Sequence, residues 1–339
     1  PEIELRHRTE TLNLRGFAAW RTWIYWDFNE LNRTNQDYIL DGNYRFTERW
    51  SVRAGGRFLR DSTQDSQLLD TGIVGILQDR DRLTAELGTA YDISERSSFD
   101  LGYQFQDTNW EFPTSLDTQF HDVQLAYNRK LKNQLDTLSL IPRFTWGTAD
   151  TYDAYDFTLS GQWERPISET LFWSFLLGVR NTQINYNEND PLNRGNTSDW
   201  GGVADISLEK RGELTTGRIA FNNQLRTNQN AEIFNVARFL VNVDHRFTPR
   251  FGAGFRGGLW YAKQLQSTDA FSDDRWFFNV SPSLFYLLTE DFILRLLYSY
   301  DQQYFIDRDN DPRVSRQRIW LRLDLNFPDT WNQLKSLSF

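Results

Sequence analysis

The chain has 339 residues, of which 39% are hydrophobic and 16% aromatic, with a formal net charge of −9 and a pI of about 5.0. This acidic balance argues against nucleic acid as a partner, because we expect no basic stripe that could neutralise phosphates. The absence of Cys excludes a disulfide framework, a thiolate nucleophile and a Cys-ligated metal. The oiliest run, residues 171–179, is about half of what a membrane helix needs.

The chain is expected to divide into three parts. Residues 1–10 are predicted to form an N-terminal periplasmic segment, and residues 328–339 a C-terminal tail. Between them, residues 11–327 alternate apolar and polar side chains with a period of two, which is the pattern of β-strands with two unlike faces. The segments number about sixteen, and an even number is expected for a single-chain bacterial barrel.

Tight turns and long connections alternate along this region. The tight turns share a short motif of Ser or Thr followed by charged residues or Pro, at residues 47–50, 94–97, 168–171, 248–251 and 289–292. The connections between them are longer and rich in Asp, Asn, Ser, Thr and Gly, as in residues 61–81 and 185–199. Short periplasmic turns and long extracellular loops are the arrangement of outer-membrane barrels.

Each strand has two alternating sets of side chains, one on each face, which we call ranks. The composition of these ranks distinguishes a membrane barrel from a soluble sandwich. In residues 318–327, Ile319, Leu321 and Leu323 alternate with Arg322 and Asp324. Nearly every strand likewise has one apolar rank without ionised residues, and a charge on a lipid face would cost about 2–4 kcal/mol at mid-bilayer. The sequence therefore predicts an all-β fold, a transmembrane antiparallel up-and-down β-barrel in the bacterial outer membrane, in contact with membrane lipid and lipopolysaccharide.

The polar rank is predicted to line a pore. Charged residues of this rank stand in or near the middle of the strands, where they would face an aqueous lumen. The predicted pore-lining residues are Asp41, Arg45, Arg53, Arg57, Glu86, Asp100, Asp122, Arg143, Asp156, Glu164, Arg180, Asp205, Arg218, Arg226, Arg238, Arg256, Trp260, Arg295, Arg322 and Asp324. Rings such as Trp260 are expected to be exposed in the lumen and to stack on sugar faces.

No motif predicts catalysis, a metal site or a cofactor. The three His residues have no catalytic or metal-binding spacing, and residues 252–258 contain GxGxxG without a following helix. The acidic loop 307–312 lacks the Gly of a calcium loop and has Arg318 at the position of the bidentate Glu. We therefore expect a protein that is not an enzyme. The apolar segment 71–77 could narrow the pore, extend a strand or contact a partner, and these interpretations stay open.

One motif resembles a known family. The stretches YRFTERWSVRAGGRF, YDISERSSFDLGYQF and EKRGELTTGRIAFNNQL each join a turn to an alternating strand. They resemble the outer-membrane β-barrels found with bacterial exopolysaccharide gene clusters, including those linked to the exosortase (PEP-CTERM) sorting system. The likeness spans most of the chain and implies a secretion conduit for a polysaccharide.

Three functions from different classes follow. The first is a polysaccharide export pore, which would work with a periplasmic export partner. The second is a general or sugar-selective diffusion porin for small hydrophilic solutes. The third is a non-conducting structural barrel that anchors a partner protein.

Overall fold

The computed structural model of the chain describes residues 2–24, 32–62, 79–111, 115–190, 194–227, 232–265, 274–289, 291–306 and 314–325. The apolar segment 71–77, the acidic loop 307–312 and the predicted tail 328–339 lie outside the described residues. No helix in these ranges has the length and apolarity needed to cross a membrane.

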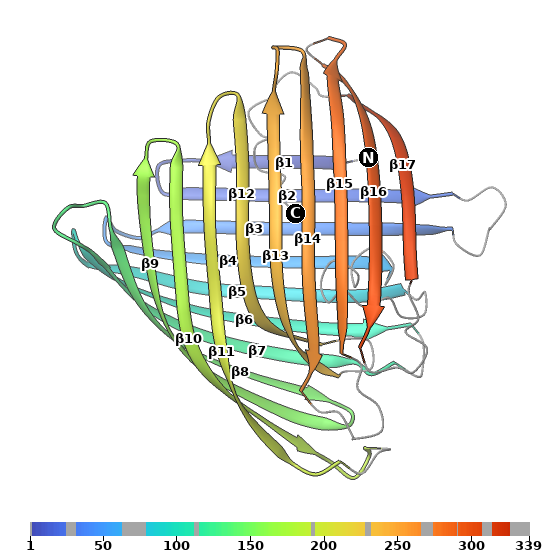
Figure 1. The fold of residues 1–339 in the computed structure, drawn as a ribbon. Coiled ribbons are helices and arrows are strands. Elements are labelled where there is room, and N and C mark those ends of the chain that lie inside the picture. Colours follow the sequence, from blue (N-terminus) through green and yellow to red (C-terminus); the bar gives the residue numbers. More distant parts are fainter. Residues whose placement is uncertain are drawn as a thin grey trace.

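The described residues form one sheet of seventeen strands (Figure 1). Each strand pairs antiparallel with the next one along the chain. The strands are β1 (Glu2–Arg8), β2 (Leu12–Trp23), β3 (Arg33–Arg45), β4 (Trp50–Ser62), β5 (Asp79–Ser94), β6 (Ser97–Trp110), β7 (Thr118–Lys130), β8 (Thr137–Ala149), β9 (Tyr152–Ser168), β10 (Leu171–Tyr186), β11 (Thr197–Arg211), β12 (Thr215–Thr227), β13 (Ile233–Arg246), β14 (Phe251–Gln264), β15 (Arg275–Leu287), β16 (Phe292–Phe305) and β17 (Val314–Leu325).

The expectation of about sixteen strands was one short, because the prediction for residues 1–10 contained no strand. Glu2–Arg8 forms β1 and pairs with β2 in a continuous register from Glu2 opposite Ala19 to Arg8 opposite Asn13. This strand has only seven residues and four of them are charged, so its apolar rank is reduced to Ile3 and Leu5. The weak alternation explains why the strand was missed.

The recurring turn motif has a common hydrogen-bonding pattern. In three turns, the Thr hydroxyl accepts the backbone N–H groups two and three residues later, with Thr47, Thr248 and Thr289 in this role. Such local bonds from Thr side chains to the backbone favour tight turns. The turn between β1 and β2 reads TETL and has a related bond, from the N–H of Leu12 to the hydroxyl of Thr9 at 3.0 Å. This fourth turn with a Thr hydroxyl as acceptor is a sequence signal for β1.

Two prolines lie within strands and interrupt the pairing without changing its register. The β7–β8 register passes from Gln124 opposite Arg143 to Tyr127 opposite Leu140, skipping Pro142. The β15–β16 register skips Pro282 in the same way. Proline has no N–H to donate to the ladder, so the local loss of pairing is expected.

The sheet is strongly twisted and curved, so that β1–β8 cross behind β9–β17 in Figure 1. One face carries large apolar side chains that are exposed, such as Leu101 at 45% and Leu177 at 48%. The largest fully buried side chains, Phe234, Phe277 and Ile293, lie on the opposite face. A single curved sheet crowds side chains on its concave side, so the opposite face is the inner one.

Candidate functional site

The inner face consists of the side chains that project opposite to the exposed apolar rank. The pairing registers assign the paired residues of the seventeen strands to a face, because residues directly opposite each other on neighbouring strands share one. All twenty residues predicted to line a pore lie on this inner face. That they line an open pore stays a prediction.

One arginine of this set reaches across an entire strand. Arg53 on β4 donates to Asp100 on β6 with both Nη atoms, at 2.6 and 2.7 Å, and so spans β5. A Cβ atom on Gly88 of β5 would lie 2.6 Å from Nε of Arg53. The glycine therefore provides the space in which the guanidinium lies flat against the wall, in a bidentate pair with fixed geometry.

Further ion pairs continue along the inner face of β2–β8. Arg57 pairs with Asp37 at 2.8 Å and Arg143 with Asp122 at 2.5 Å, each on the neighbouring strand. Arg80 and Asp61 form a bidentate pair at 3.0 and 2.9 Å whose side chains are only 3% and 6% exposed. Some of the predicted lining residues thus form cross-strand ion pairs with one another, and others pair with residues that were not predicted, such as Asp37.

Other predicted residues occupy different environments. Arg180 is 3% exposed and packs over Gly201. Its side chain is therefore buried against the sheet and is not exposed on the inner face. Arg218 and Arg256 are exposed on the inner face. Trp260 is 4% exposed, which contradicts the expectation of an exposed ring that stacks on a solute. The predicted face of Trp260 was correct, but side chains of the neighbouring strands shield the ring from solvent.

Trp260 belongs to an apolar cluster on the inner face of β13–β15. The buried members are Phe234, Val236, Trp260, Ala262 and Phe277, all at most 4% exposed. The rings of Trp260 and Phe277 lie 4.9 Å apart, a distance typical of packed aromatic pairs. This part of the wall is a packed core and is not in contact with solvent.

A second cluster lies at the end of the strands where the long connections are found. Its buried residues are Tyr152, Ala154, Ile184 and Ile233. Five partly buried side chains pack against it. They come from the β6–β7, β8–β9, β12–β13 and β14–β15 ends and from β10, and are Leu116, Ala149, Leu225, Leu265 and Tyr186, respectively. Residues from strand ends between β6 and β15 therefore meet at this end, which we call the outer mouth.

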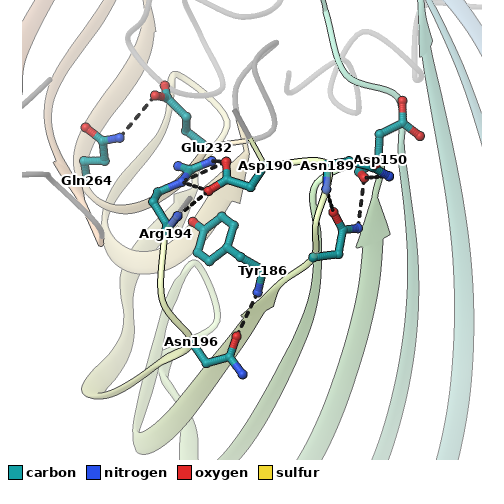
Figure 2. Close-up of polar contacts among 9 residues, drawn as sticks. Asp150, Tyr186, Asn189, Asp190, Arg194, Asn196, Glu232 and Gln264 are labelled. Atoms are coloured by element: carbon teal, nitrogen blue, oxygen red, sulfur yellow. Dashed lines mark hydrogen bonds and ion pairs between the residues drawn. The ribbon is translucent and has the colours of Figure 1, made fainter. Parts of the chain in front are cut away.

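The β10–β11 connection is held at the outer mouth by polar contacts (Figure 2). Nη2 of Arg194 lies 2.8 Å from Oδ1 of Asp190, whose side chain is fully buried. The guanidinium carbon of Arg194 also lies 4.2 Å from the ring centroid of Tyr186, in cation–π geometry. Nearby, Gln264 donates to Glu232 at 3.2 Å. We call Asp190, Arg194 and Tyr186 the mouth latch.

The base of the same connection is held by hydrogen bonds to a neighbouring backbone carbonyl and by one bond within the connection. Asn187 and Asn189 donate through their side-chain amides to the carbonyl oxygen of Asp150, at 2.9 and 3.4 Å (Figure 2). The N–H of Tyr186 donates to Oδ1 of Asn196 at 3.1 Å. The connection thus has defined contacts on both sides of the latch.

Several inner-face residues were missed at the sequence level. Arg316 and Arg318 have the same phase as Arg322, and Asp301 on β16 lies on the inner face opposite Arg316. The alternation could have identified them, whereas nothing in the sequence indicated the mouth latch. Among the described residues, no group of three or more His, Cys, Asp or Glu side chains is placed to hold a metal ion.

A glycine pair allows a test of the packing on the two faces. A Cβ atom on Gly178 of β10 would lie 2.5 Å from the carbonyl oxygen of Leu159, whereas Gly202 of β11 has nothing within 4 Å. Gly178→Ala is expected to lower the free energy of unfolding by about 1–3 kcal/mol through overpacking. Gly202→Ala, the matched control, is expected to change it by less than about 1 kcal/mol. Urea unfolding in detergent micelles measures both, and equal effects would contradict the close contact.

Comparison with known proteins identifies the fold. No protein-family model matches the chain, and no curated protein matches it either. The FrpB iron transporter from Neisseria meningitidis aligns over 91% of this chain and 61% of its own, with 6% identity and a TM-score of 0.54. A chain of the FpvAI–pyocin S2 complex aligns over 98% of this chain and 59% of its own, with 8% identity and a TM-score of 0.55.

A third solved structure also aligns over most of this chain. The siderophore receptor PiuA from Acinetobacter baumannii aligns over 92% of this chain and 63% of its own, with 7% identity and a TM-score of 0.50. The chain therefore spans about three fifths of the length of these three chains. Its all-β, up-and-down fold is the fold of outer-membrane β-barrel proteins, which agrees with the predicted location in the bacterial outer membrane.

Proposed function

We propose that the chain is an outer-membrane channel for hydrophilic solutes, and that an exopolysaccharide strand is its principal solute. The observation that carries this proposal is the separation of the two faces. The twenty predicted residues, nineteen of them charged, share the inner face, whereas the outer rank presents side chains such as Leu101 and Leu177. A wall of this kind separates lipid from an aqueous path.

The ion pairs of the inner face suit passage of a glycan. Bidentate pairs such as Arg53–Asp100 hold polar groups in fixed orientations without a large local net charge. A sugar chain can exchange hydrogen bonds with such groups as it moves, and no single site needs to bind it tightly.

The packed outer mouth favours a second candidate, the non-conducting barrel that anchors a partner. The cluster around Tyr152 and the mouth latch bring strand ends together where solutes would leave. If the latch opens, the mouth is a gate, and if it does not, the barrel is structural. The two candidates therefore differ in what happens when the latch is removed.

Planar-bilayer recording with the purified protein tests the channel. The wild-type protein is expected to show brief openings, and Arg194→Ala to increase the open probability by at least about tenfold. The variant removes the ion pair with Asp190 and the cation–π contact with Tyr186, and a loss of about 1.4 kcal/mol already changes an equilibrium tenfold. The control is Asp150→Ala, since Asp150 contributes its backbone carbonyl to the neighbouring connection.

The export function is tested separately in cells. A deletion strain is expected to lose surface polysaccharide and to regain it with the wild-type gene. Normal surface polysaccharide in the deletion strain would exclude export and leave the diffusion porin. Absence of current from both the wild-type protein and Arg194→Ala would instead support the structural barrel.

A further inference from the structure

The charges of the inner face are distributed unevenly around the sheet. On β1–β11 the inner face carries fourteen basic and fourteen acidic residues, which balance. On β12–β17 it carries ten arginines and three aspartates, a formal charge of +7. The residues of this arginine sector are Arg218, Arg226, Arg238, Arg246, Arg256, Arg275, Arg295, Arg316, Arg318 and Arg322, with Asp244, Asp301 and Asp324.

This excess is notable because the whole chain has a net charge of −9. The inner face of the described strands is therefore positive, while the acidic residues are concentrated elsewhere. A surface of one sign with low-dielectric walls raises the local concentration of ions of the opposite sign. Anions are thus the solutes that this inner face attracts.

The charge of the sector's aspartates does not neutralise that of its arginines. Two of the carboxylates each form ion pairs with two guanidinium groups. Asp301 lies 3.0 Å from Nη2 of both Arg316 and Arg318. Asp324 lies 3.0 Å from Nε of Arg295 and also contacts Arg322. Each group keeps a formal charge of +1, and its shared carboxylate orients the guanidiniums.

Aromatic rings alternate with these arginines. The guanidinium of Arg318 lies 4.7 Å from the ring centroid of Trp320, which is 37% exposed. The guanidinium of Arg295 lies 5.8 Å from the ring centroid of Phe285. Arginine matches the geometry of a carboxylate, and a partly exposed ring offers an apolar surface to a sugar face.

We propose that the arginine sector of β12–β17 binds anionic glycans that carry carboxylates, and that it makes the channel anion-selective. The anion selectivity in this inference rests on the proposed channel function, whereas the glycan binding does not. Binding of an acidic glycan by the sector requires no conduction and can be tested independently.

Two measurements on the full-length protein test the proposal. In bilayers under a KCl gradient near 0.1 M, the chloride permeability is expected to exceed the potassium permeability about threefold. The ratio should fall toward one near 1 M KCl, where the Debye length shortens from about 10 to about 3 Å. In equilibrium titration of the detergent-solubilised protein, a galacturonate hexamer is expected to bind at least about tenfold more tightly than neutral maltohexaose.

The key variant is Arg218→Gln/Arg256→Gln, which removes two exposed arginines of the sector. It is expected to lower both the permeability ratio and the hexamer affinity by at least about threefold. The matched control is Lys210→Gln/Lys263→Gln, which changes the net charge equally but on the outer face of β11 and β14.

The outcomes separate this proposal from the channel function. If the protein does not conduct in any condition, the channel function fails, and the titration alone decides the inference. A cation-selective current, or equal binding of the two hexasaccharides, overturns the inference while the channel stands. Equal effects of the two double variants would show that the selectivity does not come from the arginine sector.

Discussion

Arg80→Ala is expected to lower the free energy of unfolding by about 3–5 kcal/mol, because it leaves the buried carboxylate of Asp61 without its partner. The two side chains are 3% and 6% exposed and joined by two hydrogen bonds at 3.0 and 2.9 Å. The guanidinium of Arg80 also lies 5.4 Å from the ring centroid of Trp110, so the truncation removes packing as well. Urea titration followed by tryptophan fluorescence measures the loss.

The double variant Asp61→Leu/Arg80→Met distinguishes an uncompensated charge from a loss of volume. A buried ion pair can often be replaced by apolar residues of similar size at little cost. The double variant is therefore expected to recover most of the stability that Arg80→Ala loses. A double variant as unstable as the single one would contradict this explanation.

Leu101→Arg tests which face of the sheet meets lipid. Leu101 is the fifth of the fourteen residues of β6, lies on the outer face and is 45% exposed. A guanidinium at mid-bilayer on this face is expected to cost about 2–4 kcal/mol of folding free energy in lipid vesicles. The loss is measured from reversible urea unfolding in the vesicles, with the folded fraction read from electrophoretic mobility.

The control for this variant is Gln104→Arg, three residues further along β6. Gln104 lies on the inner face opposite Asp122, so an arginine there meets a polar wall. Its effect is expected to stay within about 1 kcal/mol, which is the usual range for polar surfaces. Similar losses for both variants would mean that the two faces do not differ in their surroundings.

The face of each residue could be predicted from the sequence because strand geometry has a strict period of two. Leu323 and Asp324 were placed on opposite faces without any knowledge of pairing, and all twenty predicted lining residues share one face for the same reason. Burial could not be predicted in this way. Trp260 has the phase of a lining residue, but its exposure depends on Phe277 of the next strand.

Ion-pair partners were also beyond the sequence. Arg53 and Asp100 are 47 residues apart and lie on strands that are not neighbours, and their contact requires the absence of a side chain at Gly88. Partners of this kind depend on register and on side-chain reach. The mouth latch depends in the same way on a connection that carries no periodic pattern.

The short first strand determines the direction of the two edges of the sheet. Because the described residues form seventeen strands and each neighbour is antiparallel, β1 and β17 run in the same direction. A hydrogen-bond ladder between these two edges would be parallel, with slanted bonds that are slightly less stable per residue. β1 also offers only seven residues to such a ladder. If these two edges pair, the line between them is therefore expected to be the weakest of the sheet under lateral tension from the bilayer, and a passage from the lumen into the lipid would begin there.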